Sequence, residues 1–149
     1  MDALIIGPPR GLADAIARGF RRRGLSALRA VAADVSDPER AAWLLDEAGR
    51  PPLVIVVDGA PYATVHQLLA LTSADVVLVA ELRTAAARPG ALPARSLVPR
   101  DEPGLTVVPL GRSGGRWFTF GSRRHEPMGA ERTAAVVLRA CGAAAASFR

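Results

Sequence analysis

Residues 3–24, ALIIGPPRGLADAIARGFRRRG, are the stretch from which the fold of this chain is read. Ala3–Ile6 form a short apolar run typical of a buried strand, and glycine follows directly. Arg10–Gly24 then reads as a helix, because one face collects residues at helical spacing: Leu12, Ala15, Ile16, Gly19 and Phe20. A strand, a glycine-rich turn and an amphipathic helix in this order begin many parallel α/β sheets.

The same alternation continues along the chain. The expected elements are a strand at Ser26–Ala33, a helix from Pro38 to Ala48 capped by Ser36 or Asp37, a strand at Leu53–Val57, a helix at Tyr62–Leu71, a strand at Asp75–Ala80, a long loop at 84–104, a hairpin of Thr106–Pro109 with Trp117–Phe120, and a closing helix at Gly129–Ala146. One alternative stays open, because residues 75–88 can also be read as a continuation of the preceding helix.

This pattern predicts an α/β fold of three layers, in which helices cover both faces of a mainly parallel sheet. It has the character of a Rossmann-like fold, with a hairpin near the C-terminus. Residues 1–149 show no internal repeat and no domain boundary, so we expect a single domain, which the family resemblance described below implies to be shortened.

Composition excludes several classes of chemistry. All 19 basic residues are arginine, so the chain has neither a P-loop lysine nor a lysine that forms a Schiff base. The single cysteine, Cys141, excludes an intramolecular disulfide, and two distant histidines make a metal site a poor expectation.

The net charge and the hydropathy limit which partners and which cell compartment we expect. The use of arginine with abundant Ala, Gly and Pro is typical of a GC-rich bacterial genome, and this composition explains much of the net charge of +5. The positive charge is therefore weak support for a nucleic-acid partner. No apolar run approaches the roughly 20 residues of a membrane span, and the start MDALIIG is a poor signal peptide. We therefore expect a cytoplasmic protein without a membrane or nucleic-acid partner.

Three stretches together resemble the short-chain dehydrogenase/reductase family. They are residues 3–24, residues 31–49 (VAADVSDPERAAWLLDEAG) and residues 52–61 (PLVIVVDGAP). More faintly, LTVVPLG at 105–111 and ERTAAVVLRAC at 131–141 are similar to the family's late strand and final helix. The resemblance implies a Rossmann fold and a nicotinamide dinucleotide site.

The residues that the resemblance assigns to that cofactor site lie mostly in the opening turn. Gly7, Gly11 and Ala13 correspond to the family's glycine-rich turn, and Arg10 before the second glycine implies NADP in preference to NAD. Leu12 adds a backbone amide to the turn. Asp34 and Gly59, which follow later strands, are the other two predicted cofactor-binding residues.

The chain also departs from the family. A helix–strand unit is missing between Gly24 and Asp34, and the catalytic Ser and Tyr-x-x-x-Lys are absent because the chain has no lysine. In the turn, Pro8 and Pro9 lack N–H groups, and the Asp14 carboxylate is expected to repel a pyrophosphate unless Arg10 pairs with it. Two interpretations therefore stay open, a functional NADP site and an inherited structural turn that binds no cofactor.

Candidate catalytic residues follow the third predicted strand. Tyr62 and His66 lie four residues apart on a predicted helix and so share a face, with Asp58 at the strand's carboxyl end. A histidine beside a phenol can favour proton transfer, as in dehydration, isomerisation or cyclisation.

The resulting hypothesis is a non-redox acid/base enzyme of bacterial specialised metabolism that acts on a small molecule. The alternatives are a pseudoenzyme that binds NADP or no ligand and serves as sensor, scaffold or accessory subunit, and an atypical NADPH-dependent reductase. Exposure of Trp117–Phe120 on an edge strand would favour a homodimer or a partner protein.

Overall fold

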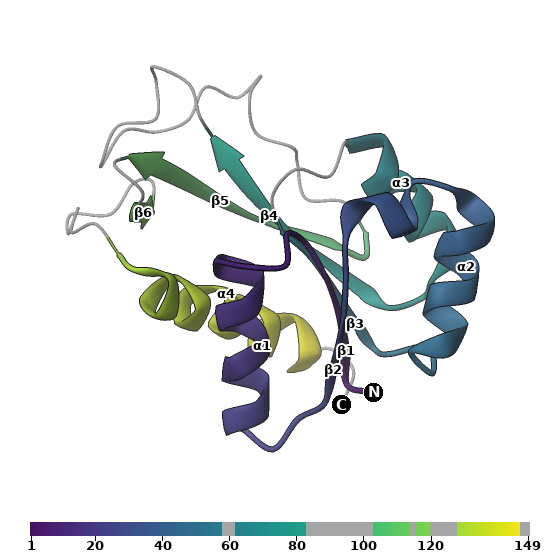
Figure 1. The fold of residues 1–149 in the computed structure, drawn as a ribbon, viewed down its shortest axis with the longest axis horizontal. Coiled ribbons are helices and arrows are strands. Elements are labelled where there is room, and N and C mark those ends of the chain that lie inside the picture. The colour runs from purple at the N-terminus through teal and green to yellow at the C-terminus, as the bar shows by residue number, and fades with distance from the viewer. Residues whose placement is uncertain (58–61, 83–102, 114–115, 120–127, 147–149) are drawn as a thin grey trace.

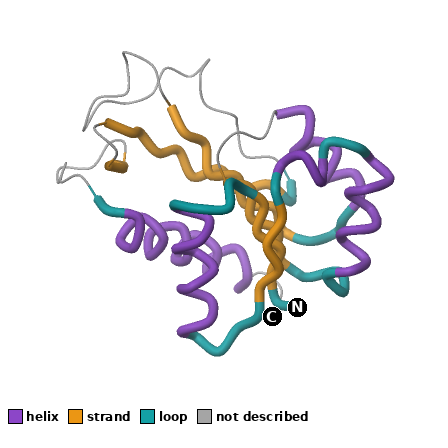
Figure 2. The backbone as a smooth tube through the Cα atoms, in the orientation of Figure 1, coloured by secondary structure: helices purple, strands orange, loops and turns teal. Residues whose placement is uncertain are grey.

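A six-stranded sheet forms the centre of the molecule, with strands in the order β2-β1-β3-β4-β5-β6 (Figures 1 and 2). The computed structural model describes residues 1–149 except 58–61, 83–102, 114–115, 120–127 and 147–149. The strands are β1 (Ala3–Ile6), β2 (Ala27–Ala30), β3 (Leu53–Val57), β4 (Asp75–Leu82), β5 (Leu105–Ser113) and β6 (Arg116–Thr119). The first five are parallel, and β6 runs antiparallel to β5.

Helices cover both faces of this sheet. They are α1 (Leu12–Arg22), α2 (Pro38–Glu47), α3 (Tyr62–Leu71) and α4 (Ala130–Ala146), with a 3₁₀ turn η1 at Ala32–Val35. Figure 1 shows α1 and α4 on one side of the strands and α2 and α3 on the other. The prediction of a three-layer, Rossmann-like α/β fold with a mainly parallel sheet is confirmed.

Two hydrophobic cores result from the alternation of side chains along each strand. Ile5 and Ile55 point to the α1–α4 side, where they pack with Ile16 and Val137. The neighbouring residues on the strands point to the other core, which α2 and α3 cover. All five residues of β3 are buried, as expected of a parallel strand that is covered on both faces.

Local sequence signals explain where the first helices lie. All the apolar positions that predict the buried face of α1 are buried. At α2, Pro38 is the first helical residue and the Asp37 carboxylate accepts the Arg40 N–H at 3.3 Å. Of the two predicted caps, Asp37 is therefore the one used.

The middle of the chain decides between the alternatives for residues 75–88. β4 pairs with β3 through Asp75–Val79 and with β5 through Val76–Leu82, so the continuation of α3 is wrong. Its β-branched valines fit a strand. The second strand is shorter than predicted, because the chain turns into η1 after Val31, whose N–H donates to the Asp34 carboxylate at 3.3 Å.

The C-terminal hairpin is confirmed with different bounds: β6 pairs with Leu110–Ser113, whereas the predicted arm Thr106–Pro109 pairs in parallel with Val77–Ala80 of β4. β6 is an edge strand of the sheet, but Trp117 and Phe118 are not exposed on it, so the condition that would favour a dimer surface is not met at these two residues. Trp117 is 5% exposed and Phe118 is 2% exposed, and Trp117 also exchanges backbone hydrogen bonds with Met128. The predicted loop at 84–104 falls outside the described residues up to 102. Within the described part of the chain, none of the helices has the length and apolar character that a bilayer span needs.

Candidate ligand-binding site

The turn between β1 and α1 lies at the carboxyl edge of the sheet, where the strand order reverses. From β1 the chain passes to β2 on one side, while β3 lies on the other side of β1. Open α/β sheets bind ligands at such a switch point, in the crevice outside the carboxyl ends of the strands. The parallel strands have the order 2-1-3-4-5, one of the two common orders of doubly wound sheets, which has one strand fewer beyond β1 than the order 3-2-1-4-5-6.

Two glycines are required by the geometry of this turn. A Cβ on Gly7 would lie 3.0 Å from the Val57 carbonyl oxygen and 3.1 Å from the Ala13 Cβ, so only glycine lets β1, β3 and α1 approach this closely. Gly11 has φ 82° and ψ −133°, a conformation that residues with a Cβ rarely adopt. Gly7 and Gly11 thus hold the turn that the sequence predicts.

The N-terminus of α1 is open. Its N-cap residue, Gly11, has no side chain with which to cap it, and the first helical hydrogen bond is that of the Ala15 N–H to the Gly11 carbonyl at 3.1 Å. The amides of Leu12, Ala13 and Asp14 precede that bond and have no acceptor within the helix. Such amides, with the helix dipole, form a favourable environment for an anion.

The Asp14 carboxylate is paired away from this end of the helix. It accepts hydrogen bonds from Arg18, one helical turn further on, and from Arg29 of β2 at 3.3 Å. The pairing with Arg10 that the sequence suggests is not among the ion pairs of the described residues. The repulsion predicted from Asp14 is therefore reduced, since two guanidinium groups neutralise its charge.

Arg29 also supports the turn itself. Its Nη2 donates to the Pro8 carbonyl oxygen at 2.7 Å, and its side chain is 23% exposed. The Nε atom of Arg29 is buried and has no hydrogen-bond partner among the described residues. A buried donor of this kind is uncommon in folded proteins and is open to an acceptor on a ligand.

An ionic cluster joins α1 to α4 beside the turn. Arg18 Nη2 donates to Glu131 Oε1 at 2.7 Å, and Arg22 Nη1 lies 3.3 Å from Glu131 Oε2. The hydrogen bond from Arg18 is the main cause of a lowered pKa at Glu131. This cluster fixes the start of α4 against the second half of α1.

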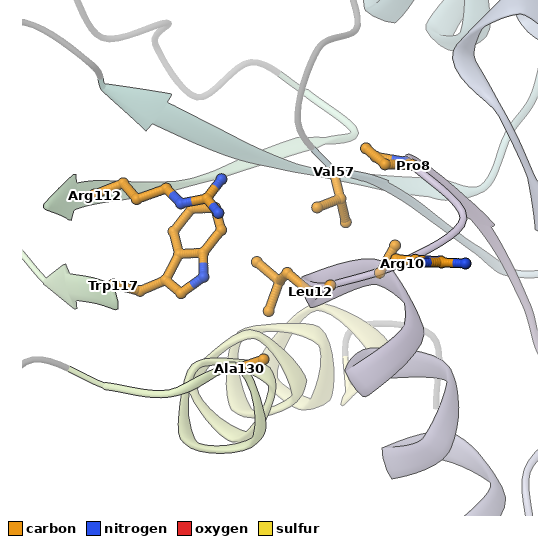
Figure 3. A pocket seen from close by; sticks show the side chains of 9 residues that line it. Pro8, Arg10, Leu12, Val57, Arg112, Trp117 and Ala130 are labelled. Carbon is orange, nitrogen blue, oxygen red and sulfur yellow. The ribbon is translucent and has the colours of Figure 1, made fainter. Parts of the chain in front are cut away.

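Two pockets lie on the two sides of the turn. The first, called here the hairpin-side pocket, has a volume of about 240 Å³ and opens between α1 and the β5–β6 hairpin (Figure 3). Its lining residues are Pro8, Arg10, Gly11, Leu12, Ala13, Val57, Arg112, Trp117 and Ala130. The second, the β2-side pocket, has about 250 Å³ and is lined by Gly7, Pro9, Arg29, Ala30, Val31 and Asp34.

The predicted cofactor residues divide between these pockets. Arg10, Gly11 and Leu12 line the hairpin-side pocket, and Gly7 and Asp34 line the β2-side pocket. Figure 3 shows the Arg10 side chain pointing away from the hairpin, so inside the hairpin-side pocket it is the turn's backbone that faces a ligand. The remaining predicted cofactor residue, Gly59, lies outside the described residues.

Of the three predicted catalytic residues, His66 is the one whose side chain the structure describes. Asp58 lies outside the described residues, and Tyr62 is the first residue of α3, with its side chain outside the description. His66 is exposed on α3, which covers the face of the sheet opposite to α1. It lines neither pocket, and the acid–base role of these three residues stays a prediction.

Three site residues were missed by sequence reasoning: Arg29, Arg112 and Trp117. Arg29 leaves a signal, because a charged residue interrupts a strand that is otherwise expected to be apolar. The sequence near the turn gives no signal for Arg112 or Trp117, because they belong to a hairpin about a hundred residues later that lies beside the turn only in the folded structure.

No protein-family model matches this chain, and no curated protein or solved structure matches it either. The feature that this structure has in common with the short-chain dehydrogenase/reductase family is therefore the Rossmann-like fold. Among the described residues, His, Cys, Asp and Glu form no group of three or more that would hold a metal ion.

Proposed function

We propose that this protein binds a phosphate-bearing nucleotide of the NADP type across the β1–α1 turn. The observation that carries the proposal is the open N-terminus of α1, which lies between two pockets at the switch point of the sheet. A pyrophosphate over the turn would accept hydrogen bonds from the amides that α1 leaves without acceptors.

The size of the pockets supports an extended ligand. Each pocket is slightly smaller than the roughly 300–1,000 Å³ of typical ligand sites, and only the two together reach that range. A dinucleotide would extend into both, with its phosphates over the turn. In this proposal the adenosine half occupies the β2-side pocket, beside the unpartnered Arg29 Nε and the carboxylate of Asp34.

The charges around the turn support a negatively charged ligand. The described residues that line the hairpin-side pocket include Arg10 at its rim and Arg112 at the hairpin, and none of them is a carboxylate. Asp14 is neutralised by its two arginine partners, and Asp34, which lines the other pocket, is paired with Arg40 at 3.1 Å. An anion in either pocket would therefore meet little uncompensated negative charge.

A role as a ligand-binding pseudoenzyme, a sensor or accessory subunit, agrees better with this geometry than acid–base catalysis does. The chain has no lysine for the hydride-transfer mechanism of the family that it resembles. His66 is exposed and lines neither pocket. We further propose that the chain descends from the short-chain dehydrogenase/reductase family by loss of one helix–strand unit.

The test is a calorimetric titration of the protein with NADP and NADPH, alongside two variants. Arg10→Ala removes an exposed charge beside the turn, and Arg21→Ala removes an equal exposed charge at the opposite end of α1. We expect micromolar binding that Arg10→Ala weakens roughly fivefold, the effect of about 1 kcal/mol at an exposed site, and that Arg21→Ala leaves unchanged. Absence of binding at millimolar ligand would show that the turn is only structural.

A further inference from the structure

The wall of the hairpin-side pocket opposite α1 is built by Arg112 and Trp117. They are cross-strand partners in the β5–β6 ladder, and the Arg112 Cζ lies 5.0 Å from the centroid of the Trp117 ring. Figure 3 shows the guanidinium over the indole at one end of the pocket, with Leu12 and Val57 between this pair and the turn. The pocket therefore has a cation at the hairpin and apolar side chains next to it.

The Trp117 ring is a rigid support. Trp117 is 5% exposed, and its backbone exchanges two hydrogen bonds with Met128, of 2.9 and 2.6 Å, while Arg112 is its cross-strand partner in β5. A guanidinium held over an aromatic face by a cation–π contact has a restricted range of positions for its N–H donors. Arg112 is thus preorganised to present donors within this range.

The chemistry of the walls selects a type of ligand. Leu12 is 4% exposed and Val57 is 1% exposed, and with Ala130 they form an apolar surface beside the cation. A planar guanidinium matches the two oxygens of a carboxylate, and the apolar surface matches a short hydrocarbon or aromatic body. A pocket of about 240 Å³ admits a compact molecule of this kind.

We propose that the hairpin-side pocket is a recognition site for a small organic carboxylate, which Arg112 binds while Leu12 and Val57 contact its apolar body. This inference rests on the proposed function, because both use the hairpin-side pocket. It adds a carboxylate at the hairpin end of that pocket, away from the β1–α1 turn. Its recognition residues are on the hairpin, so the two proposals can fail separately.

The fluorescence of Trp117 provides the test. The chain has two tryptophans, and Trp43 is 63% exposed on α2, so Trp43→Phe leaves Trp117 as the only indole without disturbing the core. Benzoate is the probe, benzamide is its neutral counterpart of the same shape, and inorganic phosphate is the competing anion. We expect a saturable change in Trp117 emission with benzoate and a much weaker response to benzamide and phosphate.

Variants of Arg112 identify the recognising group. Arg112→Gln removes the charge and should weaken benzoate binding about tenfold or more, since a charge-assisted pair is lost. Arg112→Lys should restore part of it, because the charge remains without the planar fork. Arg116→Gln removes an exposed charge on the same hairpin that does not line the pocket, and it should have no effect.

Benzoate binding of equal strength in Arg112→Gln overturns the inference, as does binding of benzamide that is as tight as that of benzoate. A stronger response to phosphate than to benzoate would also overturn it, in favour of a phosphate subsite. Urea midpoints of all variants establish that they are folded. Loss of NADP binding with intact benzoate binding would contradict the proposed function alone, whereas the reverse pattern would contradict this inference alone.

Discussion

The conformation of Gly11 predicts an unusual cost for the smallest possible substitution. With φ 82° and ψ −133°, this residue occupies a region that is essentially reserved for glycine. A Cβ at this position would meet nothing within 4 Å. Gly11→Ala therefore introduces backbone strain without a clash against neighbouring residues, which makes it a direct test of the turn.

The magnitude follows from two opposing effects. Holding a residue with a Cβ in such a conformation costs about 1–3 kcal/mol. Alanine also lowers the conformational entropy of the unfolded chain, which offsets about 0.4–1 kcal/mol of this. We therefore expect Gly11→Ala to lower the free energy of unfolding by roughly 1–2 kcal/mol.

Gly142 supplies the matched control. It lies exposed within α4, it has nothing within 4 Å of an added Cβ, and its φ is not positive. Because glycine inside a helix is less favourable than alanine by about 0.5–1 kcal/mol, Gly142→Ala should stabilise the protein. The same chemical change is thus expected to have opposite signs at the two positions.

Urea denaturation followed by circular dichroism measures both changes. With a slope of about 2 kcal/mol/M for a domain of this size, the Gly11→Ala midpoint should fall by roughly 0.5–1 M. The Gly142→Ala midpoint should rise by a smaller amount. An unchanged or raised midpoint for Gly11→Ala would refute the turn geometry, and with it the exposed amides on which the proposed nucleotide site depends.

Three further predictions concern packing and ionisation. Phe118→Ala should cost about 3–5 kcal/mol in thermal unfolding, because its buried ring lies over Gly111 on the neighbouring strand; a loss below 1 kcal/mol would contradict that packing. Burial raises the pKa of Cys141 to about 12, so iodoacetamide at pH 8 should label it only after unfolding, and rapid labelling of the native protein, followed by mass spectrometry, would be the contrary result. The hydrogen bond from Arg18 lowers the pKa of Glu131 in the folded state, so its stabilisation is present above the ordinary carboxyl range and is lost as the pH falls through that lowered pKa. Glu131→Gln should therefore reduce the fall in stability between neutral and acid pH in urea titrations, and an identical pH profile would show that the cluster contributes nothing.

Local features of the sequence determined most of the elements and the residues of the turn. β3 is predicted because its five consecutive apolar residues fit only a strand covered on both faces, and α1 because its apolar residues share a helical face. Gly7 and Gly11 were assigned through the resemblance to the glycine-rich turn of the short-chain dehydrogenase/reductase family, and the structure shows why this turn needs residues without a Cβ. These signals are readable because each depends on neighbours within a few positions along the chain.

The tertiary structure alone decided what surrounds that turn. Arg18 pairs with Glu131 across 113 positions, and Trp117 reaches the pocket beside Leu12 only because the sheet order brings the hairpin and α1 together. Asp14, which the sequence suggests as an obstacle to an anion, is neutralised because β2 places Arg29 under the turn. Contacts of this kind leave no periodic signal in the sequence, since they depend on which strands become neighbours and on how the helices pack over them.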